Sequence, residues 1–366
     1  MATLSKHFTP TVQDQGPDPW MSLGLDVRQS EAPSGRHARM ESRLERGTVS
    51  ADVDLTSMTI SRYRIIEKLG EGGMGVVYKA EDTTLRRTVA LKFLSASLLG
   101  DETARSRLLR EAQAAAAVEH PNVCPVYEID EVDGRLYIAM AYLKGQSLAA
   151  WIAEGPCDTR EALRICHQVS EGLAAIHEGG VVHCDIKPAN VFLTNEGRAV
   201  VLDFGLASLP GAQLQADDNC ARGTIAYMSP EQALGERLDQ RTDIWSTGVL
   251  LYELLSAQLP FQGKYEQVIL YSLINESPEP LALRGTAPTV ARLRALVLDR
   301  CLAKRPENRY ASAQDLAADL RDAMRAAAEE EIVNGSTAQN QSAASARKPQ
   351  VNGARRQPVR FGYASI

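Results

Sequence analysis

A short run of glycines near residue 70 could bring the backbone close to a polyphosphate. The run reads GEGGMG and contains Gly70, Gly72, Gly73 and Gly75. Three unrelated folds place glycines in this way, so the context must decide between them. A Walker A loop would continue with Lys and Ser or Thr, and a dinucleotide fingerprint would open a helix, but the chain continues as the strand-like VVYKA. We therefore expect a glycine hairpin whose missing Cβ atoms admit a phosphate; an ordinary β-turn is the alternative.

A lysine inside the next apolar strand could bind the same phosphates. Lys92 ends the run VALK, where an unpaired ammonium group would be costly to bury. Residues 101–118 follow as a predicted helix in which Leu108, Glu111 and Val118 share one face. Glu111 would thus supply a partner for Lys92 and direct it towards the α- and β-phosphates. A lysine that extends along the surface into solvent is the alternative.

The most specific pattern lies near the middle of the chain. The run HCDIKPAN begins at His183 and ends at Asn190, and DFG begins at Asp203, eighteen residues after Asp185. On these motifs the chain resembles the protein kinase family, and in particular its bacterial serine/threonine branch, over about residues 63–325. The resemblance implies an α+β, bilobal protein-kinase-like fold. Its N-terminal lobe would hold a five-stranded antiparallel sheet with one main helix, and its C-terminal lobe would be mainly helical.

The resemblance also implies a role for each residue of these motifs. Asp185 would accept the proton of the substrate hydroxyl, and Lys187 would steady the γ-phosphate of ATP. Mg²⁺, or Mn²⁺ in its place, would be held by Asn190 and Asp203. Together with the lysine–glutamate pair described above, these side chains position groups and neutralise charge, which is most of what phosphoryl transfer demands.

A nucleotide site follows from the same resemblance. Adenine would bond the backbone at two positions just past a gatekeeper methionine, and three apolar side chains would enclose its ring. The residues expected to bind ATP are Leu69, Gly70, Gly72, Gly73, Gly75, Val77, Ala90, Lys92, Met140, Ala141, Leu143 and Phe192. Of these, Ala141 and Leu143 would contact the adenine edge, Met140 is the gatekeeper, and Val77, Ala90 and Phe192 form the enclosure.

Further matches indicate the subtype and the scaffold. Lys187, two residues past the base, and Thr224 in the run GTIAYMSPE resemble the serine/threonine branch, with Thr224 in the loop that contacts the substrate. Glu231 is expected to form a buried structural ion pair with Arg309. Asp243 resembles the residue that braces the catalytic loop.

One departure from the family pattern concerns control of activity. Cys184 replaces the arginine that normally receives a phosphate on the activation loop, through a bidentate pairing that only arginine offers. Between Asp203 and Thr224 the only hydroxyl is that of Ser208. The sequence therefore predicts activity that is independent of activation-loop phosphorylation. Cys184 and Cys220 could also form a redox switch, although two inert thiols are the simpler interpretation.

The elements that must hold these residues can be followed along the sequence. Upstream of Leu148, apolar and β-branched runs broken by turns predict an antiparallel sheet of about five strands, with Asp-Gly at Asp133 as a hairpin signal. Downstream the pattern is mainly helical. The last helix begins at an SAQD capping box at Ser312 and fades after Glu331.

These patterns divide the chain into three parts. Residues 1–60 have a mixed composition without sustained period, which predicts a disordered leader. Residues 61–328 form the kinase domain, with the N-terminal lobe at about 61–143 and the C-terminal lobe at about 147–328. Residues 332–366 are predicted to be a disordered tail, which is basic because it contains five Arg and Lys residues but no Asp or Glu.

Composition narrows the class of protein. The chain has 366 residues, and an apolar content of 44% is enough for the core of a globular enzyme. A net charge of −6 gives no support for nucleic-acid binding, and six cysteines without a dense framework favour reduced thiols. No secretory signal opens the sequence, and no apolar stretch approaches the roughly 18 residues that span a bilayer. We therefore expect a cytoplasmic protein without a membrane span.

The expected activity is transfer of the γ-phosphoryl group of ATP to Ser and Thr hydroxyls of proteins, including the chain itself. A scaffold without catalysis is the rival interpretation, but such proteins usually lose the lysine, the base or the metal aspartate. Lys92, Asp185 and Asp203 are all present. Two contacts stay open: a dimer through the N-terminal lobe, and an acidic partner for the basic tail, which could also be merely solvated.

Overall fold

The structure is a computed structural model that describes residues 55–72, 75–95, 106, 109, 112–114, 116–155, 157–203, 225–281 and 292–345, with side chains in the last stretch described to 329. Every described residue belongs to one compact unit, Asp54–Ile366.

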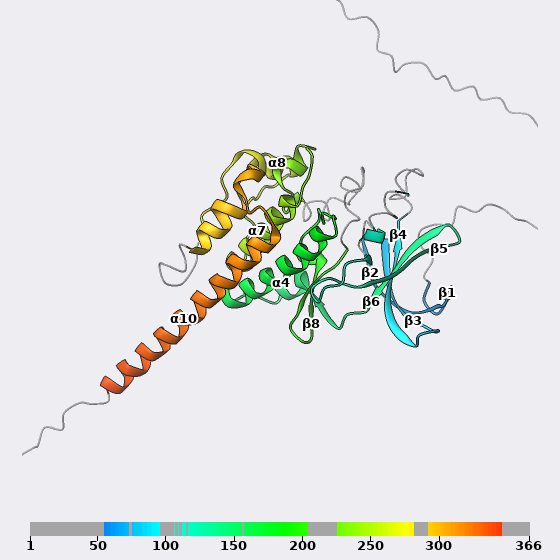
Figure 1. Ribbon diagram of the computed structural model, residues 1–366, viewed down its shortest axis with the longest axis horizontal. Helices are drawn as coiled ribbons and strands as arrows, with labels where there is room; N and C mark the ends of the chain where they lie inside the picture. The colour runs from blue at the N-terminus through cyan, green and yellow to red at the C-terminus, as the bar shows by residue number, and fades with distance from the viewer. Residues whose placement is uncertain are drawn as a thin grey trace, which may run out of the picture. The chain divides into compact units, whose positions relative to one another are not determined.

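Six antiparallel strands form one sheet, in the order β1-β2-β3-β4-β6-β5 (Figure 1). The strands are β1 (Thr59–Ile60), β2 (Tyr63–Gly72), β3 (Gly75–Asp82), β4 (Arg87–Leu94), β5 (Val126–Val132) and β6 (Arg135–Ala141). We call the described residues from 55 to 141 the sheet lobe. The five predicted strands are present, and the predicted Asp-Gly hairpin joins β5 to β6 through positive φ angles of 49° at Asp133 and 74° at Gly134.

The sheet lobe begins earlier than the sequence predicts. Leu55 is only 6% exposed and packs into the core of the lobe, and Thr59 and Ile60 pair with β2. Residues 55–60, which the sequence assigned to the leader, are therefore part of the folded sheet lobe. A strand of two residues is too short to show the alternation by which strands are recognised in a sequence.

Strand β4 is buried on both faces. One face packs into the core of the sheet lobe through Val89, Leu91 and Phe93. On the other face, Ala90 belongs to a second apolar cluster that also contains Val200 from the rest of the fold. Because successive side chains of a strand alternate between faces, Lys92 lies on the same side as Ala90. Strand β4 therefore positions Lys92 where the sheet contacts the later part of the chain, which includes Val200.

The remaining described elements, from residue 145 onward, form what we call the helical lobe. Its strands and short helices are β7 (Gly145–Ser147), α3 (Leu148–Ala153), η1 (Pro188–Asn190), β8 (Val191–Thr194), β9 (Ala199–Val201), α6 (Pro230–Ala233) and η3 (Pro306–Asn308). Its longer helices are α4 (Thr159–Glu178), α7 (Arg241–Ser256), α8 (Glu266–Asn275), the π-helix η2 (Ala295–Cys301) and α10 (Ala313–Ser345). The predicted change from sheet to mainly helical structure is confirmed.

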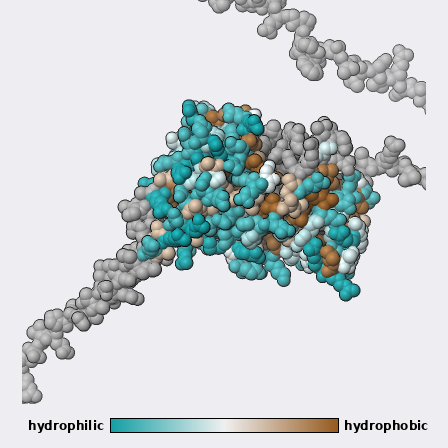
Figure 2. Space-filling model, in the orientation of Figure 1, coloured by the Kyte–Doolittle hydropathy of each residue, from teal (hydrophilic) through white to brown (hydrophobic). Residues whose placement is uncertain are grey.

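Helix α7 lies at the centre of the helical lobe. Residues on nearly all its sides are buried, including the polar side chains of Thr242, Asp243, Ser246 and Thr247. Helix α4 packs against α7, and α10 packs along α4 (Figure 1). None of the helices in the described part of the chain is both long and apolar enough to cross a membrane. In Figure 2 the visible surface of the helical lobe is mostly hydrophilic, whereas apolar residues gather over the sheet around β2, β4 and β6.

Two helices differ from, or go beyond, the predictions. Helix α10 continues to Ser345, past the end predicted at Glu331, so residues 332–345 are not a structureless tail. Most residues of this extension are weak helix formers such as Ser, Asn, Thr and Gly, but a helix whose first turns are already docked can still propagate, because nucleation is the costly step. The helix predicted for residues 101–118 is represented by helical backbone at 106, 109, 112–114 and 116, whereas Glu111 lies outside the described residues.

A glycine in α7 allows the π-helix η2 to approach closely. A Cβ atom built on Gly248 would lie 2.4 Å from the Cβ of Cys301, well inside van der Waals contact. Both residues belong to the buried core of the helical lobe, where neighbours have little room to shift.

Gly248→Ala is therefore expected to lower the free energy of unfolding by roughly 1–3 kcal/mol, the usual cost of overpacking. In a helix without this contact the same change would raise it by about 1 kcal/mol. The direction in which the urea midpoint shifts distinguishes overpacking from helix propensity. A variant more resistant to urea would contradict the packing described here.

Candidate active site

Residues 183–190, which we call the catalytic loop, bring three of the predicted residues into direct contact. Lys187 Nζ lies 2.9 Å from Asp185 Oδ2, and Asn190 Nδ2 donates to the same oxygen at 2.8 Å. The Asn190 amide also donates to the backbone carbonyl of Asp185 at 2.8 Å. Asp185 is 8% exposed. The sequence folds this way because Pro188 opens the short helix η1, for which its fixed φ is suited, and so turns Asn190 back onto Asp185.

Asp243 braces this loop, as the resemblance implied. Its carboxylate is fully buried and accepts the backbone N–H of Cys184 at 2.8 Å on Oδ1 and that of His183 at 2.9 Å on Oδ2. The ring of His177 lies 2.8 Å from the same Oδ2 through Nε2. A carboxylate in the first turn of α7 thus fixes the two residues that precede Asp185.

His183 has a structural role in this geometry. Its Nε2 lies 2.9 Å from the carbonyl of Leu202, which can only accept, so Nε2 carries a proton. Its Nδ1 accepts the backbone N–H of Asp185 at 3.2 Å. With both ring nitrogens engaged in this way, His183 connects the catalytic loop to the segment that leads into Asp203.

The cysteine beside Asp185 is enclosed. Cys184 is 7% exposed, and the five described cysteines are free thiols. This burial favours the inert interpretation of Cys184 over a redox switch, because oxidation requires access. Cys220, the other candidate for a redox role, lies outside the described residues.

Lys92 reaches a different carboxylate from the one predicted. Its Nζ lies 2.9 Å from Asp203 Oδ2, and the lysine is only 3% exposed. The expected pair with Glu111 stays a prediction, because Glu111 lies outside the described residues. Asp203 itself is close to Asn190, since the backbone N–H of Leu202 donates to the Asn190 carbonyl at 2.8 Å. The sheet lobe and the catalytic loop thereby meet around one acidic residue.

The two predicted metal ligands suit a hard divalent cation. Among the described residues there is no group of three or more His, Cys, Asp or Glu side chains that could enclose a metal on its own. Asn190 and Asp203 offer oxygen donors from two adjacent segments. Mg²⁺ is usually bound by one or two such side chains and completes its shell with waters and phosphate oxygens, so the donor set fits.

The predicted adenine site is assembled at the edge between the lobes. Ala90 and Met140 belong to the apolar cluster that contains Val200, with Val77 and Leu143 packed against it. Phe192 is paired with Val200 across β8 and β9, and Ala141 ends β6. The Ala141 N–H donates to the Pro125 carbonyl at 2.9 Å, so of its two backbone groups only the carbonyl can serve an adenine edge.

The glycines of the hairpin differ in what the fold requires. Gly75 has a φ of 134°, and a Cβ there would lie 1.9 Å from the Phe93 carbonyl oxygen, so the sheet itself needs this glycine. At Gly70 and Gly72 a Cβ would meet no atom within 4 Å. Their lack of side chains is therefore not explained by packing, and Leu69 beside them is 44% exposed. Gly73 lies outside the described residues.

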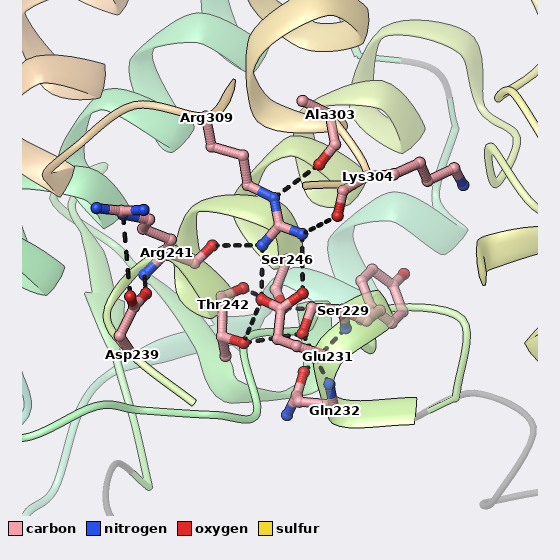
Figure 3. Close-up of polar contacts among 11 residues, drawn as sticks. Ser229, Glu231, Gln232, Asp239, Arg241, Thr242, Ser246, Ala303, Lys304 and Arg309 are labelled. Atoms are coloured by element: carbon pink, nitrogen blue, oxygen red, sulfur yellow. Dashed lines mark hydrogen bonds and ion pairs between the residues drawn. The ribbon is translucent and has the colours of Figure 1, made fainter. Parts of the chain in front are cut away.

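A buried ion pair secures the helix that follows the activation segment (Figure 3). Arg309 binds Glu231 in a bidentate manner, with Nη1–Oε1 at 2.6 Å and Nη2–Oε2 at 2.8 Å. The remaining donors of the guanidinium bind the carbonyls of Ala303, Lys304 and Arg241. Burial raises the pKa of Glu231, but the hydrogen bonds and positive charge of Arg309, together with hydrogen bonds from the backbone and Thr242, lower the pKa overall. Thr224, the predicted substrate-loop residue, lies outside the described residues.

Several functional residues were missed in the sequence. Ser229 and Gln232 form a capping box at α6, and the Gln232 amide also donates to the Cys184 carbonyl at 2.7 Å. The hydroxyl of Thr242 donates to Glu231 at 2.9 Å, and His177 contacts the bracing Asp243. The Ser-x-x-Gln spacing was a readable signal for the cap. Nothing in the sequence pattern distinguished His177 from its neighbours on α4.

Comparisons with known proteins agree with this geometry. A family model described as protein kinase domain matches residues 63–320. The chain is 36% identical over 263 residues to serine/threonine-protein kinase PrkC of Bacillus subtilis, covering 72% of this chain and 40% of that protein. It is 40% identical over 266 residues to serine/threonine-protein kinase PknB of Mycolicibacterium smegmatis, covering 71% of this chain and 42% of that one.

A solved structure shares the fold. The crystal structure of the PknI kinase domain of Mycobacterium tuberculosis matches with a TM-score of 0.60 and 29% identity, covering 74% of this chain and 100% of that chain. The bilobal α+β fold predicted from the sequence is thereby confirmed. The chain spans about two fifths of the length of the curated relatives PrkC and PknB.

Arg309→Met is expected to lower the free energy of unfolding by about 3–5 kcal/mol, because it leaves Glu231 buried without its partner. Arg241→Met is a matched control. The Arg241 side chain lies 3.9 Å from the exposed Asp239, a surface pair worth at most about 1 kcal/mol. Denaturant midpoints at neutral pH measure both.

The stabilisation of the fold by the Glu231–Arg309 pair should depend on pH in a definite direction. Since the folded pKa of Glu231 is lowered, the pair stabilises the fold above the unfolded pKa of the carboxyl, and this contribution is lost as pH falls through the folded value. The difference in free energy of unfolding between the original protein and Arg309→Met should therefore become smaller in acid. A difference that grew as pH fell would contradict the assignment.

Proposed function

This chain belongs to the protein kinase family, and from its site we propose that it transfers the γ-phosphoryl group of ATP to serine and threonine hydroxyls of proteins, its own chain included. The observation that carries the proposal is the cluster of Asp185, Lys187 and Asn190 beside the Lys92–Asp203 ion pair. The relatives named as serine/threonine kinases support the class of acceptor.

Asp185 is arranged to act as the base. Both Lys187 and Asn190 contact its Oδ2. In the proposed reaction the other oxygen, Oδ1, would face the hydroxyl of the substrate. The bond from Asn190 to the backbone of the same residue fixes the carboxylate relative to its own peptide. A base held in this way can accept the hydroxyl proton as the new oxygen–phosphorus bond forms.

The lysines supply positive charge where the phosphates would lie. Lys187, adjacent to the base, would neutralise the γ-phosphoryl oxygens, and Lys92 would bind the α- and β-phosphates after exchanging part of its contact with Asp203. We propose Asn190 and Asp203 as the ligands of Mg²⁺, for which Mn²⁺ could substitute. When bound, the cation would neutralise charge on the β- and γ-phosphates.

The hairpin between β2 and β3 would cover the phosphates. Gly70 and Gly72 leave open space where side chains would otherwise stand, so backbone groups could approach a charged ligand closely. Val77, Ala90 and Phe192 would enclose the adenine ring, with the Ala141 carbonyl and the Leu143 backbone at its edge. The ring would then rest on apolar surface that already forms one packed cluster.

We also propose that activity does not depend on phosphorylation of the activation segment. Cys184 has no guanidinium with which to receive a phosphate, and its backbone is already held by Asp243. Ser208 is the one hydroxyl between Asp203 and Thr224.

Asp185→Asn is expected to reduce phosphoryl transfer about 10²- to 10⁴-fold while ATP still binds, because the base is lost and the charge-neutralising lysines stay. Transfer of labelled phosphate from Mg²⁺-ATP to dephosphorylated casein, with nucleotide binding measured separately, tests this. Asp239→Asn, which removes an exposed aspartate, is the control and should leave the rate unchanged. An Asp185→Asn protein that kept full transfer activity would refute the proposal.

Treatment with phosphatase, and separately the change Ser208→Ala, are each expected to leave at least half of the activity. The physical reason is that no arginine stands at position 184 to exploit an added phosphate. Mass spectrometry should confirm that residues 203–224 carry no phosphate in the treated sample. Loss of most activity on phosphatase treatment, accounted for by a single phosphorylated site between residues 203 and 224, would show that the segment requires phosphorylation.

A further inference from the structure

The residue before the catalytic base has a strained backbone. Cys184 has a φ of 64°, in the left-handed region that residues with a Cβ adopt rarely because of crowding with the carbonyl oxygen. Such a conformation persists only where the surrounding structure holds it, and it is found mostly at functional sites. What holds Cys184 therefore bears directly on the geometry of Asp185.

Two side chains grip the Cys184 backbone from different elements. The carboxylate of Asp243, on α7, accepts its N–H at 2.8 Å. The amide of Gln232, on α6, donates from Nε2 to its carbonyl oxygen at 2.7 Å. Gln232 is 8% exposed, so this bond is shielded from competing water. The carbonyl end of the strained residue thus depends on a glutamine in the helix that follows the activation segment.

The amide of Gln232 can point in only one way. Its Oε1 accepts the backbone N–H of Ser229 at 2.9 Å, and the Ser229 hydroxyl accepts the backbone N–H of Gln232 at 3.3 Å. Since Ser229 N–H needs an acceptor and the Cys184 carbonyl needs a donor, the two partners fix the orientation of the amide. Helix α6 is itself anchored by the Glu231–Arg309 pair, and the Ser229 hydroxyl lies 2.8 Å from that of Thr242 (Figure 3).

We propose that Gln232 is a positioning residue for Asp185, acting through the peptide that joins Cys184 to the base. That peptide plane carries both the carbonyl bound by Gln232 and the Asp185 N–H, which donates to His183 Nδ1 at 3.2 Å. If the carbonyl is released, the plane can rotate towards a relaxed conformation and carry the Asp185 carboxylate with it. The inference rests on the proposed kinase activity. It adds that the helix that follows the activation segment sets the catalytic loop through an uncharged bond that is made on folding.

Two changes at Gln232 separate positioning from folding. Gln232→Glu keeps an acceptor for the Ser229 N–H but has no donor for the Cys184 carbonyl when ionised, and Gln232→Leu removes both bonds. Gln240 offers a matched control: its Nε2 donates to the Ala311 carbonyl, also at 2.7 Å, at a position outside the catalytic loop. Gln240→Glu and Gln240→Leu therefore delete the same kind of bond elsewhere in the same lobe.

The five full-length proteins are compared for transfer from Mg²⁺-ATP to dephosphorylated casein, with kcat referred to the concentration of ATP-binding sites and Tm measured in parallel. Both Gln232 variants should lose at least about tenfold in kcat, which is about 1.4 kcal/mol in the barrier, with the KM for ATP changed less than about twofold. The Gln240 variants should keep kcat. Gln232 variants with an unchanged kcat, or with a loss no greater than that of their Gln240 counterparts, would overturn the inference. If the original protein transfers no phosphate, the proposed function itself fails.

Discussion

The carboxylate of Asp243 is the interaction on which the geometry of the site depends. It is fully buried in the first turn of α7, where it accepts backbone N–H groups from His183 and Cys184 and contacts the ring of His177. A buried carboxylate is costly unless hydrogen bonds replace its lost water, and the positive end of a helix favours it further. The charge and the catalytic loop therefore need each other. Without the carboxylate the loop would have unsatisfied donors, and without the loop the carboxylate would lack partners.

The helical lobe is organised to keep that turn of α7 in place. The helix is buried on nearly all its sides, and Thr242, next to Asp243, donates to the Glu231–Arg309 pair that anchors α6. Asp243, which holds the catalytic loop, and Thr242, which contacts the ion pair that holds α6, are thus neighbouring residues. In the sheet lobe, β4 is buried on both faces. The ammonium group of Lys92 is therefore buried as well, and it contacts the carboxylate of Asp203. Apolar packing thus sets the positions of α7 and β4, and the charged groups of Asp243 and Lys92 make their contacts from those positions.

Much of this could be predicted from the sequence, because the motif residues and the strand and helix periods are local signals. The contact of Asp185 with its lysine and asparagine follows from their spacing across a proline turn. The contact of Lys92 with Asp203 could not be predicted in the same way, because it joins two segments far apart in the sequence and depends on tertiary packing. The role of Gln232 was partly visible as a helix cap. Its bond to a carbonyl 48 positions earlier in the chain depends on how two elements are placed in three dimensions.

The chemistry of an anchor decides what can switch it. An arginine beside the base carries a charge that gains from a counter-charge, and a phosphate is one that can be added and removed. Cys184 carries no such charge, and its backbone groups meet Asp243 and Gln232, which are in place once the chain has folded. The bond from Gln232 is between two uncharged groups, so salt screens it far less than an exposed pair of ions. If activity is independent of activation-segment phosphorylation, as proposed above, control would act elsewhere: on access of nucleotide, on docking of the substrate, or on the amount of protein.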